Sequence, residues 1–123
     1  MPPIPPIRDN QVEAVADWMQ THRENRRPLS VSAPLLTLVC ALHEKGYALP
    51  NRRRLAAAIG CTKEGVEAAI STSIAYGEIT ERHVTLEGAV AQHGSTPEGR
   101  FLDPSPDLLH VCRGRKYTIG RRA

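Results

Sequence analysis

The chain has 123 residues, of which 41% are hydrophobic, and this is enough for one compact domain with its own core. Its net charge of +3 permits a polyanionic partner but does not require one. We expect a cytoplasmic protein without a transmembrane helix, signal peptide or disulfide framework, because apolar runs are short, the N-terminus lacks a charged-then-apolar layout, and the cysteines are odd in number and widely spaced.

The chain begins with an extended arm that is followed by a helix. Residues 1–8 are rich in proline, which excludes a helix there, and such an arm either is disordered, packs on a partner subunit or reaches a groove. Asp9 or Asn10 can cap a helix that extends to about residues 22–25. Its apolar positions share one face and are Val12, Val15, Ala16 and Met19, with Trp18 beside them. Residues 9–27 thus form an N-terminal helix and linker that either packs on the core or acts as a dimerisation element.

The next helix is predicted to form the centre of the core. Ser32 can cap it, Pro34 fits in its first turn, and Gly46 ends it. Its broad apolar face consists of Leu35, Leu36, Leu38, Val39 and Leu42. Cys40 and His43 lie on or near this helix and are interpreted as core or flank residues.

Residues 50–80 predict two short helices joined by a tight turn. Gly60 can adopt the left-handed conformation that ends the first helix, and Thr62 can cap the second. The apolar positions are Leu55, Ala56 and Ile59 on the first helix and Val66, Ile70 and Ile74 on the second. Gly77 then ends the second helix, and Ile79 begins a β-prone run.

This order of helix, turn, helix, glycine and strand resembles winged helix-turn-helix DNA-binding proteins. The matching positions are Leu55, Ala56, Ile59, Gly60, Thr62, Val66, Ile70, Gly77 and Ile79. Ser73 stands where this family usually has a leucine, and we expect Ile74 to take over its packing. The resemblance implies a mainly helical α+β fold with a small β wing and an extra N-terminal helix, with residues 28–120 as the winged helix-turn-helix domain.

Glycine and proline interrupt the rest of the chain repeatedly. Residues 79–86 alternate partly between apolar and polar, and residues 109–119 hold two short β-prone pieces around Arg113. We interpret these two segments as the strands of a wing with a long irregular loop between them. Residues 86–92 are either part of this loop or a short helix, and residues 121–123 form a basic tail.

The resemblance implies two sets of DNA contacts. Polar side chains on the exposed face of the second helix would meet base edges, and these are Thr62, Lys63, Glu67 and Ser71. Cations beside the helix pair and on the wing would meet phosphates, and these are Arg52, Arg53, Arg54, Arg113, Arg115 and Lys116. The first three arginines fall at a helix start, whose amides also attract phosphate, although a solvated helix start is the other interpretation. Glu64 and Glu67 make the second helix slightly acidic, so that its affinity for DNA must come from neighbouring cations.

Metal binding and catalysis have less support. Five histidines and three cysteines supply ligand types without a C-x-x-C or H-x-x-x-H spacing, and the closest pair is His110 with Cys112. The chain has no G-x-S-x-G, phosphate-binding loop or glycine-rich dinucleotide turn. We therefore expect no metal, no cofactor and no enzymatic activity. Cys61 precedes a helix N-terminus that could favour its thiolate, although a small residue filling the turn is the simpler interpretation.

The sequence favours a small transcriptional regulator of a bacterium or mobile element. We expect a homodimer that binds a short site in double-stranded DNA, and its size favours a repressor or accessory factor over a regulator gated by a ligand. The alternative is a winged-helix protein-interaction module, an adaptor or inhibitor, that presents its acidic helix to a protein and does not bind DNA.

Overall fold

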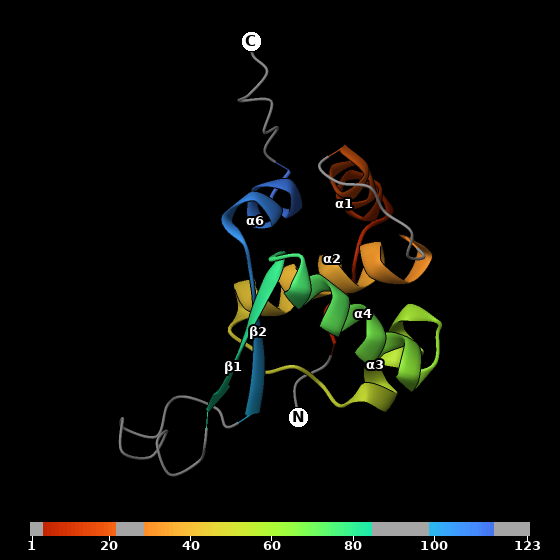
Figure 1. The fold of residues 1–123 in the computed structure, drawn as a ribbon, viewed down its shortest axis with the longest axis vertical. Helices are drawn as coiled ribbons and strands as arrows, with labels where there is room; N and C mark the ends of the chain where they lie inside the picture. Colours follow the sequence, from red (N-terminus) through yellow and green to blue (C-terminus); the bar gives the residue numbers. More distant parts are fainter. Residues whose placement is uncertain (1–3, 22–28, 85–98, 115–123) are drawn as a thin grey trace.

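The computed structural model describes residues 4–21, 29–84 and 99–114 of the chain. They form a mainly helical α+β fold with a two-stranded antiparallel sheet at one side (Figure 1), so the predicted α+β class is confirmed. In chain order, the elements are α1 (Asp9–Thr21), α2 (Leu29–Lys45), α3 (Arg52–Ile59), α4 (Lys63–Ala75), β1 (Ile79–Val84), β2 (Gly99–Pro104) and α6 (Pro106–Cys112). No helix in these three ranges is long and apolar enough to cross a membrane.

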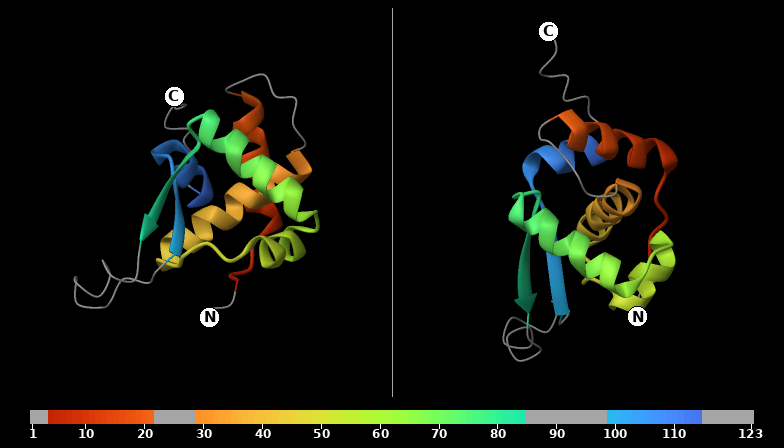
Figure 2. Two further views of the ribbon diagram at one scale, coloured as in Figure 1. Left: turned by 60° about the horizontal axis from the view of Figure 1, so that its bottom comes forward. Right: turned by 45° about the vertical axis from the view of Figure 1, so that its right-hand side comes forward.

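Helix α2 is the centre of the core, as the sequence predicts (Figure 2), and every side chain from residue 35 to residue 40 is buried. Its predicted start is wrong, because Ser32 does not cap the helix but is buried inside it. Leu29 and Val31 pack against the core, and this apolar contact extends the helix toward its N-terminus. Pro34 therefore lies within the helix, where its missing N–H removes one hydrogen bond near the helix start.

Local capping interactions define α3 and α4. The Asn51 side chain accepts a hydrogen bond from the Arg54 N–H at 2.9 Å, and the Thr62 hydroxyl accepts one from the Gly65 N–H at 3.0 Å. Gly60 ends α3 in the left-handed conformation, with a φ of 85°. The predicted order of helix, glycine turn, threonine cap and second helix is therefore confirmed.

The last turn of α4 differs from the prediction. Ser73 is completely buried, whereas Ile74 is 36% exposed, so Ile74 does not take over the core position. The buried residues of α4 are Val66, Ala69, Ile70 and Ser73, and their spacing of three, one and three residues defines a single helical face. Ile74 is turned away from this face by the helical rotation.

Strand β1 pairs with β2 in antiparallel register along its whole length. The segment between α2 and α3 lies beside β2, because the Leu49 N–H donates a hydrogen bond of 2.7 Å to the Arg100 carbonyl. A Cβ atom on Gly99 would lie 3.0 Å from the Ala48 Cβ, so this close approach favours glycine at the start of β2. The sheet is thus attached to the helical core on its β2 side.

The predicted second strand of the wing is wrong in its position. Residues 99–104 form the strand that pairs with β1, and Leu109 lies in helix α6. Ser105 caps α6 by accepting a hydrogen bond from the Leu108 N–H at 3.2 Å, and Pro106 occupies the first helical position. The suggested helix at 86–92 and the tail at 121–123 lie outside the described residues.

The apolar face of α1 is used within the chain. Val15, Trp18 and Met19 are buried, and α1 lies against α2 and α6 (Figure 1). Ile4 and Ile7 of the arm also pack against the core. Packing on the protein's own core is one interpretation of the N-terminal helix. For the arm it is not among the interpretations, and Ile4 and Ile7 nevertheless pack there.

Candidate nucleic-acid interface

The starts of α3 and α4 place basic side chains around one shallow depression. Asn51, Arg52, Arg53 and Lys63 line this hollow, which has a volume of about 280 Å³. Arg52, Arg53 and Lys63 are exposed. The backbone amides in the first turn of each helix add positive partial charge on the same side. The hollow therefore combines three cations with two helix N-termini.

Arg52, Arg53 and Arg54 differ in their surroundings. The Arg52 Nε lies 3.8 Å from the Glu67 Oε2, whereas Arg53 and Lys63 have no ion-pair partner in the described part of the chain. Arg54 is half-buried and takes part in interactions of its own. Arg53 and Lys63 are thus the two cations of the hollow that form no ion pair with another described residue.

The exposed face of α4 carries the side chains predicted to meet bases. Lys63 and Ser71 are exposed, and Thr62 is exposed at the cap. The Thr62 oxygen accepts the Gly65 N–H, so this hydroxyl retains its own hydrogen for donation to a ligand. Glu67 is partly exposed in the middle of the same face.

Glu67 is held by arginines, an arrangement that the sequence analysis missed. Arg100 of β2 donates from Nη1 to the Glu67 Oε2 at 3.0 Å, and its Nε also pairs with Glu81 of β1. Burial alone would lower the pKa of Arg100, but the hydrogen bonds to Glu67 and Glu81 raise it above its usual value. Arg100 therefore remains a cation that joins α4 to the sheet. No signal in the sequence paired these positions, because they lie 33 residues apart.

Of the wing residues predicted to meet phosphate, Arg113 is not placed as expected. Arg113 follows the last residue of α6, away from the β1–β2 hairpin, and its Nε lies 2.7 Å from the Glu44 Oε2 of α2. Its assignment to the wing is therefore wrong, because residues 106–112 form a helix. Arg115 and Lys116 lie outside the described residues.

The face of the sheet that carries Phe101 holds a separate ion pair. The Arg82 Nε donates to the Asp103 Oδ2 at 2.7 Å, and the His43 Nδ1 lies 3.3 Å from the Asp103 Oδ1. The Arg82 guanidinium also lies over the Phe101 ring, 4.6 Å from its centre. The hydrogen bond from Arg82 lowers the pKa of Asp103, so this carboxylate stays ionised and paired with Arg82.

The structure favours the simpler interpretation of Cys61, a small residue that fills the turn. Burial raises the pKa of the Cys61 thiol, which stabilises the protonated form even though a helix N-terminus follows it. Among the described residues, no group of three or more His, Cys, Asp and Glu side chains is arranged to hold a metal ion. The basic hollow and the exposed face of α4 therefore remain as the candidate binding surface on this side of the molecule.

The chain matches no protein-family model, and neither a curated protein nor a solved structure shows significant similarity to it. A function therefore has to be inferred from the arrangement of side chains.

Proposed function

We propose that this protein is a winged helix-turn-helix transcriptional regulator that binds double-stranded DNA. The observation that carries this proposal is the pair of cations without an ion-pair partner in the described residues, Arg53 and Lys63, at the adjoining starts of α3 and α4. Phosphates would bind at this hollow, and the exposed face of α4 would then lie along the base edges. By occupying its DNA site, the protein would repress transcription or assist another DNA-binding factor.

The arrangement around α4 supports this proposal. A three-helix unit of α2, α3 and α4 is followed directly by an antiparallel hairpin, which is the order of a winged helix. Arg100 and Glu67 join the hairpin to α4, so the two parts would present one surface to a duplex. The wing in this proposal consists of β1 and β2.

The proposed contacts divide by function. Arg52, Arg53 and Lys63 would supply salt-dependent affinity through phosphates, together with the half-buried Arg54. Thr62 and Ser71 would contact bases together with Lys63. Glu67 could accept a hydrogen bond from a cytosine amino group only by giving up part of its contact with Arg100.

Fluorescence anisotropy with random duplex DNA, titrated from low to physiological salt, tests the proposal. Binding that weakens steeply with salt is expected, and Arg53→Ala should reduce the slope of log K against log salt by about one. Arg8→Ala is the matched control, since it removes the same charge from the far side of α2. No binding at low salt, or an equal effect of both substitutions, contradicts the proposal.

Sequence selection tests the base contacts separately. Ser71→Ala and Glu67→Ala should change which sequences are enriched from a random pool, whereas Arg53→Ala should weaken all sequences alike. If Glu67→Ala and Arg100→Ala weaken binding equally and leave the preferred sequence unchanged, Glu67 acts by positioning Arg100 and reads no base.

We also propose a homodimer, because two copies can read two half-sites of a duplex. The buried face of α1 is used within the chain, so the contact between copies would involve other surfaces. Light scattering across a concentration series, with and without a selected duplex, measures this directly. A single copy on the selected duplex would contradict the dimer.

The alternative, a protein-interaction module with an acidic helix, has one observation in its favour: Glu64 is exposed on α4. The second acidic residue, Glu67, is offset by Arg100 and Arg52, which reduces the acidic character of this surface. Failure to bind DNA at low salt would favour this alternative, and affinity capture with Glu64→Gln as the control would then identify a protein partner.

A further inference from the structure

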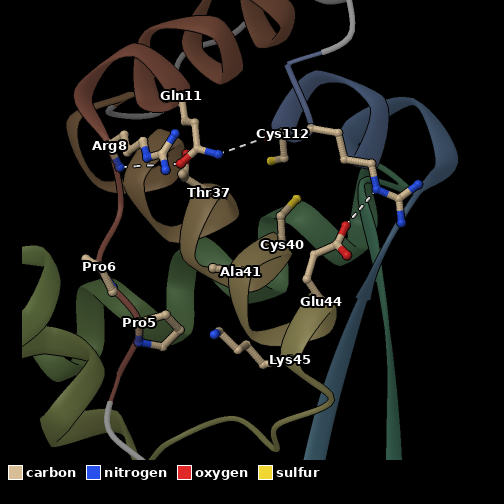
Figure 3. A pocket seen from close by; sticks show the side chains of 11 residues that line it. Pro5, Pro6, Arg8, Gln11, Thr37, Cys40, Ala41, Glu44, Lys45 and Cys112 are labelled. Carbon is tan, nitrogen blue, oxygen red and sulfur yellow. Dashed lines mark hydrogen bonds and ion pairs between the residues drawn. The ribbon is translucent and has the colours of Figure 1, made fainter.

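The far side of α2 carries an open cleft of about 710 Å³ (Figure 3). Its floor is a stripe of α2, and its walls are the arm, the start of α1 and the end of α6. The residues that line it are Pro5, Pro6, Arg8, Gln11, Thr37, Cys40, Ala41, Glu44, Lys45, Cys112 and Arg113. Its volume falls in the range of small-ligand sites, so the protein has a cavity that its size did not lead us to expect.

Two of the three cysteines meet at the floor of this cleft. Cys40 lies in the middle of α2 and Cys112 is the last residue of α6, and both side chains line this one cleft. The backbone on both sides is fixed, because the Gln11 Nε2 donates to the Cys112 carbonyl at 2.9 Å and the Cys40 thiol lies 3.9 Å from the Leu108 carbonyl. Both sulfurs border the cleft, which gives a small ion a path to them (Figure 3).

We propose that Cys40 and Cys112 form a two-thiolate site for a soft monovalent ion of the Cu(I) class. Thiolates favour soft ions, and zinc would need further ligands for its four-coordinate geometry. Within the described residues, no third His, Cys, Asp or Glu completes such a group. A monovalent d10 ion needs only two thiolate ligands, which is the number of cysteines that line the cleft.

A bridging ion and a disulfide require different separations of the two sulfurs. Metal–thiolate bonds of about 2.3 Å hold two sulfurs up to about 4.6 Å apart. A disulfide would instead require the sulfurs to approach to about 2.05 Å, and Cys40 and Cys112 are both free thiols in the structure.

The charges around the cleft favour the bound form. A monovalent cation with two thiolates carries a net charge of −1, and the cations Arg8 and Lys45 border the cleft without an ion-pair partner in the described residues. Arg113 also favours the Cys40 thiolate, whereas Glu44 opposes it and pairs with Arg113. The hydrogen bond with Cys112 and burial raise the pKa of Cys40, so the ion must displace a proton from this thiol when it binds.

Anaerobic titration of the reduced full-length protein with Cu(I), in competition with a chromophoric Cu(I) chelator, tests the site. One equivalent should be withdrawn from the chelator, with tighter binding at higher pH because protons are released. Cys40→Ser and Cys112→Ser should each weaken binding by more than about tenfold. Cys61→Ser is the matched control and should bind as the unchanged protein does.

Protection from alkylation provides a second readout that needs no substitution. Cys40 and Cys112 are buried, so the comparison is made under conditions in which a maleimide labels both in the ion-free protein. Bound Cu(I) should slow this labelling, while Cys61 should react equally with and without the ion, as measured by peptide mass spectrometry. The proposal is overturned if the protein withdraws no ion from the chelator, if Cys61 alone is protected, or if a folded Cys40→Ser protein binds Cu(I) as tightly as before.

Discussion

The two sides of α2 are built from different kinds of contact (Figure 2). On one side, α3 and α4 are defined by neighbours in sequence, through the Asn51 and Thr62 caps and the Gly60 turn. On the other side, α1 and α6 are held by residues far apart in the chain, such as Gln11 with Cys112. The first side can therefore carry exposed cations at little cost to the fold, whereas the second depends on buried packing.

The largest effect on stability is expected from Leu108→Ala. Leu108 is completely buried in α6, so its removal leaves a cavity and should lower the free energy of unfolding by about 2–5 kcal/mol. Urea denaturation followed by circular dichroism measures this loss. Leu109→Ala is the control, because Leu109 is only partly buried and should cost clearly less. Equal losses would show that α6 does not depend on its buried face.

A smaller effect is expected from Gly60→Ala in the turn between α3 and α4. No atom lies within 4 Å of the added Cβ, so the cost arises from the left-handed backbone and should be about 1–2 kcal/mol. Gly60→Asn should cost less, since asparagine tolerates this conformation better. The same denaturation experiment compares the two variants. If Gly60→Asn costs as much as Gly60→Ala, the backbone conformation is not the cause.

This contrast also explains what the sequence could predict. Gly60, Thr62 and Gly77 act on their immediate neighbours, so helix ends in this region could be read from residue types. The start of α6 has the same kind of signal in Ser105 and Pro106, which the prediction of β-prone pieces at residues 109–119 does not use. Local signals were thus sufficient for the end of α3 and the start of α4.

The contacts of the candidate sites could not be predicted in the same way. Glu67 meets Arg100, and Cys40 meets Cys112, only after the sheet and α6 have packed against the helices. For neither pair does the number of residues between the two positions indicate that they lie close together in the folded protein. Ser32 illustrates the same limit, because tertiary contacts of Leu29 extended α2 past a residue that is a favourable cap by type.

The contact between the two parts of the proposed DNA surface can be measured by a double-mutant cycle of Glu67→Gln and Arg100→Gln. Both side chains are about 30% exposed, so solvent screens the pair and the coupling should stay below about 1 kcal/mol. The double variant should then lose less stability than the sum of the single variants. Additive losses would show that Arg100 stabilises the sheet through other contacts, and that Glu67 is available to a ligand.

The smallest effect concerns Asp103, on the face of the sheet that carries Phe101. Its pKa in the folded protein is lowered by the hydrogen bond from Arg82, so the stability that it contributes is present above the unfolded pKa of about 3.9 and is lost as the pH falls through the folded pKa. Asp103→Asn should therefore be less stable than the unchanged protein at neutral pH by less than about 1 kcal/mol, because Arg82 is half exposed. Thermal unfolding at a series of pH values measures the difference, which should shrink toward zero in strong acid.

Asp17→Asn, an exposed change on α1, is the control and should show a smaller difference at neutral pH. A difference for Asp103→Asn that persists unchanged in acid would mean that shape and hydrogen bonding of the side chain matter there, and its charge does not.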